Sequence, residues 1–385
     1  GAGYIRPMKH MSPADEKAIA RAQLEWFRRL MRPLPWRRTY APYEVWISEV
    51  MLQQTQMERG VGYFLRWMER FPDVSAVAAA SDEDILNAWE GLGYYRRARF
   101  LHAAAKVMCE RHGGRVPSEP EALAALPGLG AYTVAAIRGI AFNQDVVVVD
   151  ANVERVFTRL LNIDVPPKKR AAAVLIGEAA RCLLPTGHAR EYNQALMEFG
   201  ALVCRKVPLC IDCPLAAWCE SRRLGVERER PVLAPKPAVI PVFTGHGVLV
   251  HGGRTLLAKR PEGGVWGGLW EFPGGEQVGD EPPARAAERA FATLGLAVRA
   301  KDDLGSVRHG YTNHRLTARF FRMEASPGVN LDNVLRILEK RADVRLVPCR
   351  GTGALAMPAH HRKLADRFFS GVRRRGDAQE QGTLV

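Results

Sequence analysis

A single carboxylate stands among apolar neighbours in SEVMLQQTQ (residues 48–56). Glu49 shares the i, i+3, i+4, i+7 spacing of one helix face with Trp46, Val50 and Gln53. We therefore expect its side chain to point toward the protein interior. A buried carboxyl group is costly unless it is paired, and burial raises its pKa. The position of Glu49 therefore raises the question of why this helix accepts the cost of a buried carboxylate.

A second carboxylate and a glycine turn lie further along the chain. In LPGLGAYTVAA (residues 126–136), Gly128 and Gly130 precede an apolar helix, and such a turn exposes backbone N–H groups that can hold an anion. Asp150 then follows an apolar run and precedes another helix. An aspartate there is also an ordinary N-cap residue, so neither feature alone decides the chemistry.

Four thiols crowd into the segment CRKVPLCIDCPLAAWC, at Cys204, Cys210, Cys213 and Cys219. Four thiolates in one short loop can enclose a compact metal centre, and both zinc and an iron–sulfur cluster accept four cysteines. Structural zinc usually takes two separated C-x-x-C knuckles, whereas this loop has one C-x-x-C flanked by single cysteines. The spacing therefore favours an iron–sulfur cluster, with zinc as the alternative.

The composition bounds the class of protein. A chain of 385 residues with 47% apolar and 25% charged residues is an ordinary globular protein long enough for two domains. Its net charge of +14 favours a polyanionic partner, most simply nucleic acid. A charged membrane surface and a solvated basic surface without a partner are the alternatives.

We expect an intracellular, cytoplasmic protein, because no apolar run is long enough to span a bilayer and the first residues lack a signal peptide. Thiols stay reduced in that compartment. The cysteines outside the cluster are expected to be plain buried thiols, namely Cys109, Cys182 and Cys349.

The periodicity changes along the chain. Residues 10–220 show helical spacing broken by Gly and Pro, which predicts an all-α domain, and residues 221–239 are rich in charge and proline, as in a linker. Residues 240–371 predict a smaller α+β domain, and residues 372–385 a basic, disordered tail.

The C-terminal domain shows four local signals. Two apolar runs around Gly252 and Gly253 predict a β-hairpin, and Arg315–Arg322 alternates like a half-buried strand. Helices are expected over Pro283–Leu294 and Asn333–Lys340.

Several motifs resemble one enzyme family. LPWR (34–37), APYEVWISEVMLQQT (41–55) and GLGYYRRA (91–98) are similar to adenine-specific, MutY-type DNA glycosylases, and DAN (150–152) keeps their essential carboxylate. The cysteine loop resembles the one that closes the catalytic domain of these and of endonuclease III-like glycosylases, although the family has one more residue between its first two cysteines. The resemblance implies an all-α helix-hairpin-helix glycosylase domain with a [4Fe-4S] loop.

The resemblance also implies catalytic roles. Glu49 matches the general acid that protonates adenine at N7, and Asp150 matches the anion that stabilises the oxocarbenium-like sugar. Tyr132 and Asn152 match residues that support Asp150. Tyr132 also stands where strand-cleaving relatives carry a nucleophilic lysine, which implies base removal without backbone cleavage. The residues matched to the substrate pocket are Arg32, Trp36, Arg37, Leu52 and Gln194, with a plain core position as the alternative for Trp36 and Leu52.

Contacts with duplex DNA are implied as well, since adenine must be rotated out of the stack. Gln54, Leu92 and Tyr94 match residues that enter the duplex, and Gly128 and Gly130 match the hairpin that grips its backbone.

Around the Leu92–Tyr94 turn, Trp89 and Tyr95 are expected to pack in the interior. Arg96, Arg97 and Arg99 are expected either to hold phosphates or to form a solvated helix face.

The segment WGGLWEFPGG (266–275) resembles the entry to the Nudix-like C-terminal domain of adenine glycosylases. Active Nudix hydrolases bind metal through helical glutamates, but here those positions hold Arg289, Ala292 and Thr293, which implies binding without pyrophosphatase chemistry.

In the family this domain reads 8-oxoguanine through a Phe-Ser-His loop, whose places are taken here by Tyr311, Thr312 and Asn313. The Thr312 hydroxyl can still hydrogen-bond a base edge, whereas Asn313 departs from the family. His314 is expected to be a solvent-exposed loop residue, with substitution for the missing histidine as the alternative.

Together these features predict a monofunctional adenine DNA glycosylase that flips and excises adenine opposite 8-oxoguanine or guanine in base excision repair. The expected partner is double-stranded DNA containing that pair, and the protein is expected to be a monomer without membrane contact. The alternatives are a bifunctional endonuclease III-like glycosylase/lyase, a nucleotide pyrophosphohydrolase and a catalytically silent lesion-binding protein.

Overall fold

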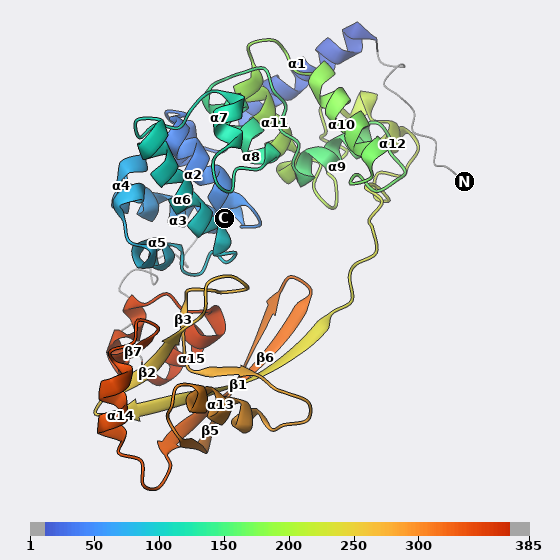
Figure 1. Cartoon of the computed structure of the whole chain (residues 1–385). Helices are drawn as coiled ribbons and strands as arrows, with labels where there is room; N and C mark the ends of the chain where they lie inside the picture. Colours follow the sequence, from blue (N-terminus) through green and yellow to red (C-terminus); the bar gives the residue numbers. More distant parts are fainter. Residues whose placement is uncertain (1–11, 370–385) are drawn as a thin grey trace. The chain divides into compact units, whose positions relative to one another are not determined.

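The structure is a computed structural model that describes residues 12–369, so the predicted tail at 372–385 lies outside the described residues. The chain divides into two compact units, which contain the helices and the sheet seen in Figure 1. The first unit comprises Gly1–Ala80 and Phe100–Lys236, and the second comprises Ser81–Arg99 and Pro237–Val385. The segment Ser81–Arg99, expected within the helical domain, thus groups with the C-terminal residues.

The first unit is helical, as the Gly- and Pro-punctuated apolar spacing predicted. Its α-helices are α1 (Pro13–Leu30), α2 (Pro42–Leu52), α3 (Met57–Arg70), α4 (Val74–Ala79), α6 (Arg96–Arg111, whose first residues belong to the second unit), α7 (Pro120–Ala124), α8 (Ala131–Ala136), α9 (Ala151–Leu160), α10 (Arg170–Cys182), α11 (Ala189–Leu202) and α12 (Glu220–Arg223). A π-helical turn, Ile137–Ala141, extends α8. Prolines at the first helical position begin α1, α2 and α7.

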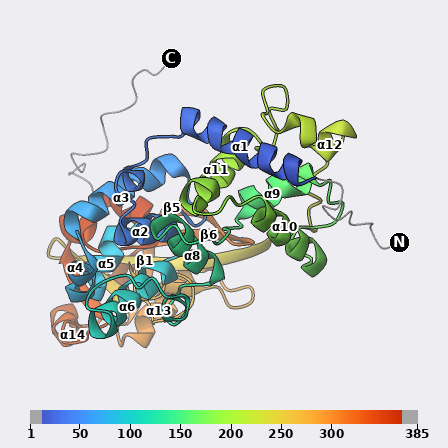
Figure 2. The ribbon, with the colours of Figure 1, turned by 90° about the horizontal axis from the view of Figure 1, so that it is seen from above.

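The core of this unit lies where α1 crosses α11 (Figure 2). Trp26 of α1 packs edge-on against Phe199 of α11, with ring centroids 5.3 Å apart, and Phe27, Phe157 and Tyr192 are fully buried beside them. Each such ring contributes roughly 2 kcal/mol by leaving water. This packing gives the helices that carry the candidate site a rigid support.

Helix α2 differs from the predicted one-sided stripe. Every residue from Val45 to Met51 is buried, so Glu49 lies in a helix that is enclosed all round. The spacing correctly placed Glu49 inward but did not show that the opposite face is also covered.

The second unit contains α5 (Asp82–Trp89) and a seven-stranded sheet of order β3-β2-β1-β6-β5, with β4 paired to β1 and β7 to β2. Strands β1 and β6 are parallel, and the other pairs are antiparallel. The strands are β1 (Ile240–His251), β2 (Arg254–Lys259), β3 (Trp270–Glu271), β4 (Gly274–Glu276), β5 (Val298–Tyr311), β6 (His314–Ala325) and β7 (Val344–Pro348), and the remaining helices are α13 (Pro283–Thr293), α14 (Leu331–Leu338) and α15 (Ala359–Phe369).

The predicted local elements of this unit are confirmed. Gly252 and Gly253 form the β1–β2 turn with φ of 54° and 74°, the left-handed region that glycine adopts without strain. The strand predicted at Arg315–Arg322 lies within β6, and the predicted helices correspond to α13 and α14, the latter beginning two residues earlier than expected because Asn330 caps it.

Three buried histidines hold α15 against the sheet. His246 of β1 engages the carbonyl of Phe272 through Nδ1 at 3.2 Å and the hydroxyl of Thr244 through Nε2 at 2.9 Å. His361 accepts the N–H of the same Phe272 at 3.2 Å, and its ring meets that of His360 at 4.4 Å. Burial lowers the pKa of all three imidazoles, so they stay neutral at pH 7.

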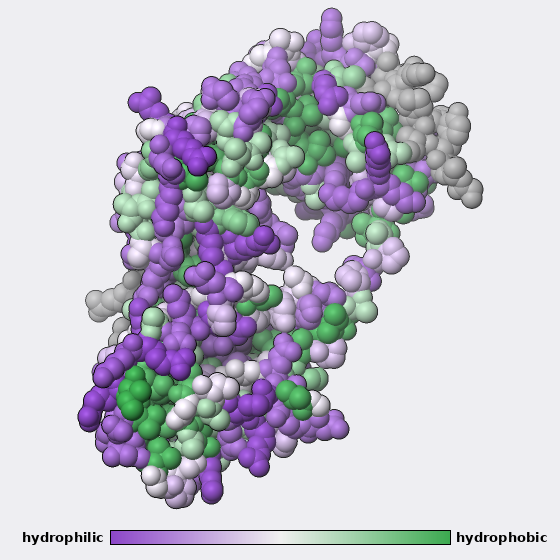
Figure 3. Space-filling model, in the orientation of Figure 1, coloured by the Kyte–Doolittle hydropathy of each residue, from purple (hydrophilic) through white to green (hydrophobic). Residues whose placement is uncertain are grey.

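Hydrophilic side chains cover most of the face shown in Figure 3, in keeping with the +14 charge. Among residues 12–369, none of the helices is both long enough and apolar enough to cross a bilayer. The linker expected at 221–239 is without helix or strand from Gly225 to Val239.

Candidate active site

Glu49 lies in the middle of α2 with 7% of its surface exposed. Its Oε2 accepts a hydrogen bond of 2.9 Å from the Tyr132 hydroxyl on α8. Burial raises the pKa of Glu49 to about 7, and the charge of Asp150 acts in the same direction, while the Tyr132 bond and the charge of Arg37 oppose the rise. A carboxyl group with this pKa can donate a proton at neutral pH.

Asp150 is the N-cap of α9, so the capping interpretation of the sequence is confirmed. Its Oδ1 accepts the Val153 N–H at 2.7 Å, and its Oδ2 accepts the Asn152 side-chain amide at 2.8 Å. Burial raises the pKa of Asp150, and these hydrogen bonds oppose the rise. Because they favour the ionised form, capping the helix is compatible with an anionic role at the site.

Tyr132 has a different partner from the expected one. The resemblance implied support of Asp150, but the hydroxyl donates to Glu49 instead. Burial, followed by the charge of Glu49, raises the pKa of Tyr132 far above its usual value, so the hydroxyl keeps its proton. Asn152 does contact Asp150, and Arg155 in turn donates to the Asn152 oxygen at 2.8 Å.

The apolar run before Asp150 is held in place by one side chain rather than by a sheet. Asn193 of α11, fully buried, donates to the carbonyl of Val146 and accepts the N–H of Val148, both at 2.8 Å. Gly139 permits this approach, since a Cβ there would lie 2.6 Å from the Asn193 amide nitrogen. Asn193 therefore fixes the segment that delivers Asp150.

A buried carboxylate that the sequence analysis missed organises the predicted substrate pocket. Glu198 is 2% exposed and forms ion pairs with Arg37 and with Arg32, whose Nε lies 3.2 Å from Glu198 Oε1. Arg37 also donates from Nε to Gln194 Oε1 at 2.8 Å. Gln194 and Glu198 stand four residues apart on α11, and this i, i+4 spacing is the signal that could have found Glu198.

The other residues expected near the base differ in exposure. Trp36 is buried, with its ring 5.1 Å from that of Phe64, and so takes the core position that was the alternative expectation for it. Leu52 is half-buried. Gln54 is exposed and adopts a φ of 57° just after α2. A non-glycine residue in the left-handed region is strained, and such strain is typical of functional turns.

The hairpin glycines have different environments. Gly128 has a φ of 76° and lies against Phe100, so a Cβ added at Gly128 would come within 2.4 Å of the Phe100 Cβ. Gly130 is the exposed N-cap of α8, with open space where a side chain would stand. Backbone groups at Gly130 are thus accessible to a large ligand.

In the second unit, the turn at Gly91–Tyr94 exposes half of the Tyr94 surface but only 7% of Leu92. Trp89 and Tyr95 are buried, as predicted. Arg97 is not on a solvated face: its Nη2 donates to the carbonyls of Leu92 and Gly93, both at 3.2 Å, and burial lowers its pKa to about 10. It braces the turn from inside, which corrects the expectation of a solvated helix face for this residue.

The β5–β6 hairpin carries the residues expected to read the opposite base. His314 stacks on Tyr311 with centroids 4.9 Å apart, and its Nδ1 lies 3.0 Å from the Thr312 hydroxyl. The Asn313 side chain bonds elsewhere than to this Tyr311–His314 stack, since its amide donates to the Ala238 carbonyl at 3.0 Å. His314 is therefore a half-buried partner of Thr312 rather than a free loop residue.

Arg289 of α13 is the residue expected at one of the metal-binding glutamate positions of a Nudix hydrolase. Its guanidinium donates to the Glu276 carbonyl at 2.9 Å and pairs with Glu281. A cation already fills this position, which disfavours a divalent ion there.

The four clustered cysteines line one hollow together with Arg159, Pro208 and Glu227. Arg159, 2% exposed, donates to the carbonyls of Cys204, Arg205 and Lys206 and lies 3.4 Å from Cys204 Sγ. Burial, and further the neighbouring thiols, raise the pKa of Cys213 to about 12 and that of Cys219 to about 11. Such thiols ionise together only beside a cationic centre, so the donor set fits a metal group.

The thiols outside this cluster are not the buried residues we expected. Cys182 is exposed because it is the last residue of α10, and Cys109 and Cys349 are only partly buried.

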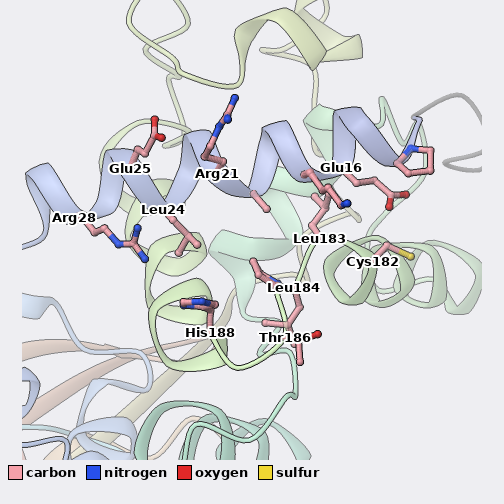
Figure 4. A pocket seen from close by; sticks show the side chains of 14 residues that line it. Glu16, Arg21, Leu24, Glu25, Arg28, Cys182, Leu183, Leu184, Thr186 and His188 are labelled. Carbon is pink, nitrogen blue, oxygen red and sulfur yellow. The ribbon is translucent and has the colours of Figure 1, made fainter.

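A hollow elsewhere in the first unit lies between α1 and the segment Cys182–His188 (Figure 4). Leu24 and Arg28 of α1 point toward this segment, and none of the predicted site residues lines the hollow.

Comparison with known proteins identifies two family domains. Residues 47–178 match the family described as HhH-GPD superfamily base excision DNA repair protein, and residues 245–367 match the NUDIX domain family.

Individual relatives share one description. The chain is 32% identical to the adenine DNA glycosylase of Rattus norvegicus over 369 residues, covering 80% of this chain and 71% of the rat protein. It is 42% identical to that of Mycobacterium tuberculosis over 209 residues, covering 52% of this chain and 67% of the relative. It is 35% identical to the Arabidopsis thaliana enzyme over 303 residues, covering 68% of this chain but only 48% of that protein.

Proposed function

The chain belongs to the adenine DNA glycosylase family, and we propose that it removes adenine paired with 8-oxoguanine or guanine from duplex DNA. The observation that carries this proposal is the pair of buried carboxyl groups, Glu49 and Asp150, with unlike hydrogen-bond partners.

Glu49 acts as the general acid. Adenine anion is a poor leaving group, so the glycosidic bond breaks only when a proton reaches the base. A carboxyl group with a pKa of about 7, buried and bonded to Tyr132, remains partly protonated where an ordinary glutamate is ionised.

Asp150 stabilises the positive charge that develops on the sugar. Two N–H donors, from Val153 and Asn152, favour the ionised carboxylate against the effect of burial, and the two carboxyl groups then divide the work as in glycoside hydrolysis. No lysine stands in the hairpin helix, where Tyr132 takes its place, so the product is an abasic site in an uncut strand.

Arg37, Gln194 and Glu198 read the extruded base. Glu198 holds the Arg37 guanidinium in place, and the bond from Arg37 to Gln194 fixes the amide in one orientation. Fixed donors and acceptors discriminate against bases with a different polar edge.

The β5–β6 hairpin reads the base opposite adenine. Tyr311 offers a ring face for stacking, and Thr312 with His314 offers hydrogen-bonding groups for the altered edge of 8-oxoguanine. His314 thus replaces the histidine of the family loop, while Asn313 supports the hairpin through Ala238.

Cys204, Cys210, Cys213 and Cys219 hold a [4Fe-4S] cluster, with zinc as the weaker alternative. The single C-x-x-C with flanking cysteines and the gathering of all four thiols around one hollow support the cluster. When bound, the cluster would supply the cationic iron beside which the thiols ionise. Arg159, 3.4 Å from Cys204 Sγ, holds the loop that carries them. The protein acts on double-stranded DNA as a monomer.

Single-turnover assays on duplexes bearing A·8-oxoG, A·G and A·C, with and without alkali, test the proposal. We expect adenine release from the first two duplexes, strand breaks only after alkali, and a loss of at least about a hundredfold in Glu49→Gln and Asp150→Asn with duplex binding kept. Normal turnover by either variant overturns the assigned roles, and strand breaks without alkali overturn the monofunctional assignment.

A further inference from the structure

The second unit joins its two DNA-reading loops through a largely buried ion pair, Glu90–Arg362. Glu90 ends the α5 region immediately before the Gly91–Tyr94 turn, and Arg362 lies on α15. Arg362 Nε donates to Glu90 Oε1 at 2.9 Å, and the side chains are 17% and 12% exposed for Arg362 and Glu90 respectively. The same Glu90 oxygen accepts the Met357 N–H at 3.2 Å.

The Arg362 side chain is fixed on its other edge. Its Nη1 donates to the Thr352 carbonyl at 3.1 Å and its Nη2 to the Leu355 carbonyl at 2.5 Å. A guanidinium held at three points transmits position better than a flexible surface pair, because few rotamers satisfy all its bonds.

From Glu90, the contacts continue into the turn. Trp89 donates from Nε1 to the Gly93 carbonyl at 3.1 Å, and Gly91 donates its N–H to the Tyr95 hydroxyl at 3.1 Å. With Arg97 bonded to the carbonyls of Leu92 and Gly93, hydrogen bonds hold the turn that directly follows Glu90.

From helix α15, which carries Arg362, contacts of another residue continue into the hairpin. His360 of α15 lies with its ring 4.8 Å from Trp266, and Trp266 lies 4.8 Å from Tyr311, which stacks on His314. The bond between Glu90 and Arg362 thus connects the turn side to α15 through a largely buried pair of charges.

We propose that Glu90 and Arg362 are positioning residues that set the Tyr94 turn according to what the Tyr311–His314 hairpin binds, so that the pair determines the preference for A·8-oxoG over A·G. This inference rests on the proposed function of the hairpin. Breaking the pair uncouples the loops and removes the preference, while the carboxyl groups of the first unit keep their own contacts.

The test compares Glu90→Gln, Arg362→Gln and the double variant with Glu83→Gln. Glu83 also lies on α5 and pairs with Arg345 of β7 at 2.8 Å, but both side chains are more exposed, at 33% and 44%. It is a matched control because it removes another ion pair between the α5 region and the C-terminal part of the second unit without touching the turn. Single-turnover excision is measured on A·8-oxoG and A·G duplexes, and 2-aminopurine beside the lesion reports insertion of the turn without chemistry.

We expect each variant of the pair to lower the A·8-oxoG to A·G rate ratio at least about fivefold, with the double variant no worse than the single ones. Excision from A·G should stay within about twofold, as should the ratio in Glu83→Gln. An equal fall in the excision rate on both duplexes indicates a merely structural role and overturns the inference. An unchanged A·8-oxoG to A·G rate ratio in the variants overturns it as well, and so does a wild type that shows no preference between the two duplexes. A wild type that releases adenine from neither duplex defeats the proposed function instead, and the 2-aminopurine signal then still decides whether the pair sets the turn.

Discussion

The bond from Tyr132 to Glu49 predicts a specific change in the pH profile. The hydroxyl donates to the carboxylate at 2.9 Å and thereby favours the ionised form, which lowers the pKa of Glu49 against the effect of burial. Tyr132→Phe removes this donor and keeps the ring. The pKa of Glu49 should therefore rise above its value of about 7.

The size of the rise follows from the strength of the bond. A hydrogen bond to a charged group contributes about 1.5 kcal/mol at the low end, and one pKa unit corresponds to about 1.4 kcal/mol, so the pKa should move up by about one unit. A general acid works only while protonated, so the rate declines as the pH rises through this pKa. Relative to its own plateau, Tyr132→Phe should be about tenfold more active than the wild type well above pH 8.

Single-turnover adenine release between pH 5.5 and 9.5, under conditions where DNA is saturating, measures the midpoint of this decline. Thr133→Val is the control. It removes the hydroxyl of the residue next to Tyr132, which accepts a hydrogen bond of 3.2 Å from Gln53 Nε2, without touching Glu49. Its midpoint should match the wild type. A Tyr132→Phe midpoint that stays in place or moves to lower pH refutes the assignment of Glu49 as the acid.

Three further outcomes are expected. His246 has a pKa of about 4 in the folded protein, against 6.5 in an unfolded chain, so the unfolded state binds the proton first as the pH falls. The free energy of unfolding should therefore fall by up to about 3 kcal/mol as the pH drops from 6.5 to 4. Urea unfolding at pH 7 and pH 5 should show a smaller difference between the two pH values in His246→Gln than in the wild type, and an equal difference contradicts this. Cys213→Ser should lose bound iron and the visible absorbance of the purified protein, whereas exposed Cys182→Ser should keep both; retention of full iron content by Cys213→Ser would exclude it as a ligand. Glu198→Gln should weaken adenine release about tenfold or more by freeing Arg37, and an unchanged rate argues against its role in the pocket.

Much of the architecture was predictable because it depends on local signals. Prolines and glycines divided the helices, and Gly252–Gly253 marked a hairpin whose backbone angles only glycine adopts freely. The inward position of Glu49 followed from helical spacing, and the family of the chain followed from motifs that the comparisons confirm.

The remaining features depend on residues distant in sequence. Tyr132 and Glu49 are 83 positions apart, so no local pattern shows that the hydroxyl donates to the acid rather than to Asp150. Arg97 stands among other arginines and resembles a solvated face, yet the carbonyls of the preceding turn draw it inward. The grouping of residues 81–99 with the C-terminal unit likewise brings together residues far apart in sequence, such as Glu90 and Arg362.

Asp150 begins helix α9 through Oδ1, which accepts the Val153 N–H, and the proposed mechanism assigns the charge of the same carboxylate to the reaction centre. Shortening this side chain would fray the first turn of α9 at a cost of about 1 kcal/mol in addition to silencing the chemistry. An inactive protein intended to capture intact DNA is therefore better made with asparagine than with alanine, because an amide oxygen can still receive the Val153 N–H and keep the helix start in order.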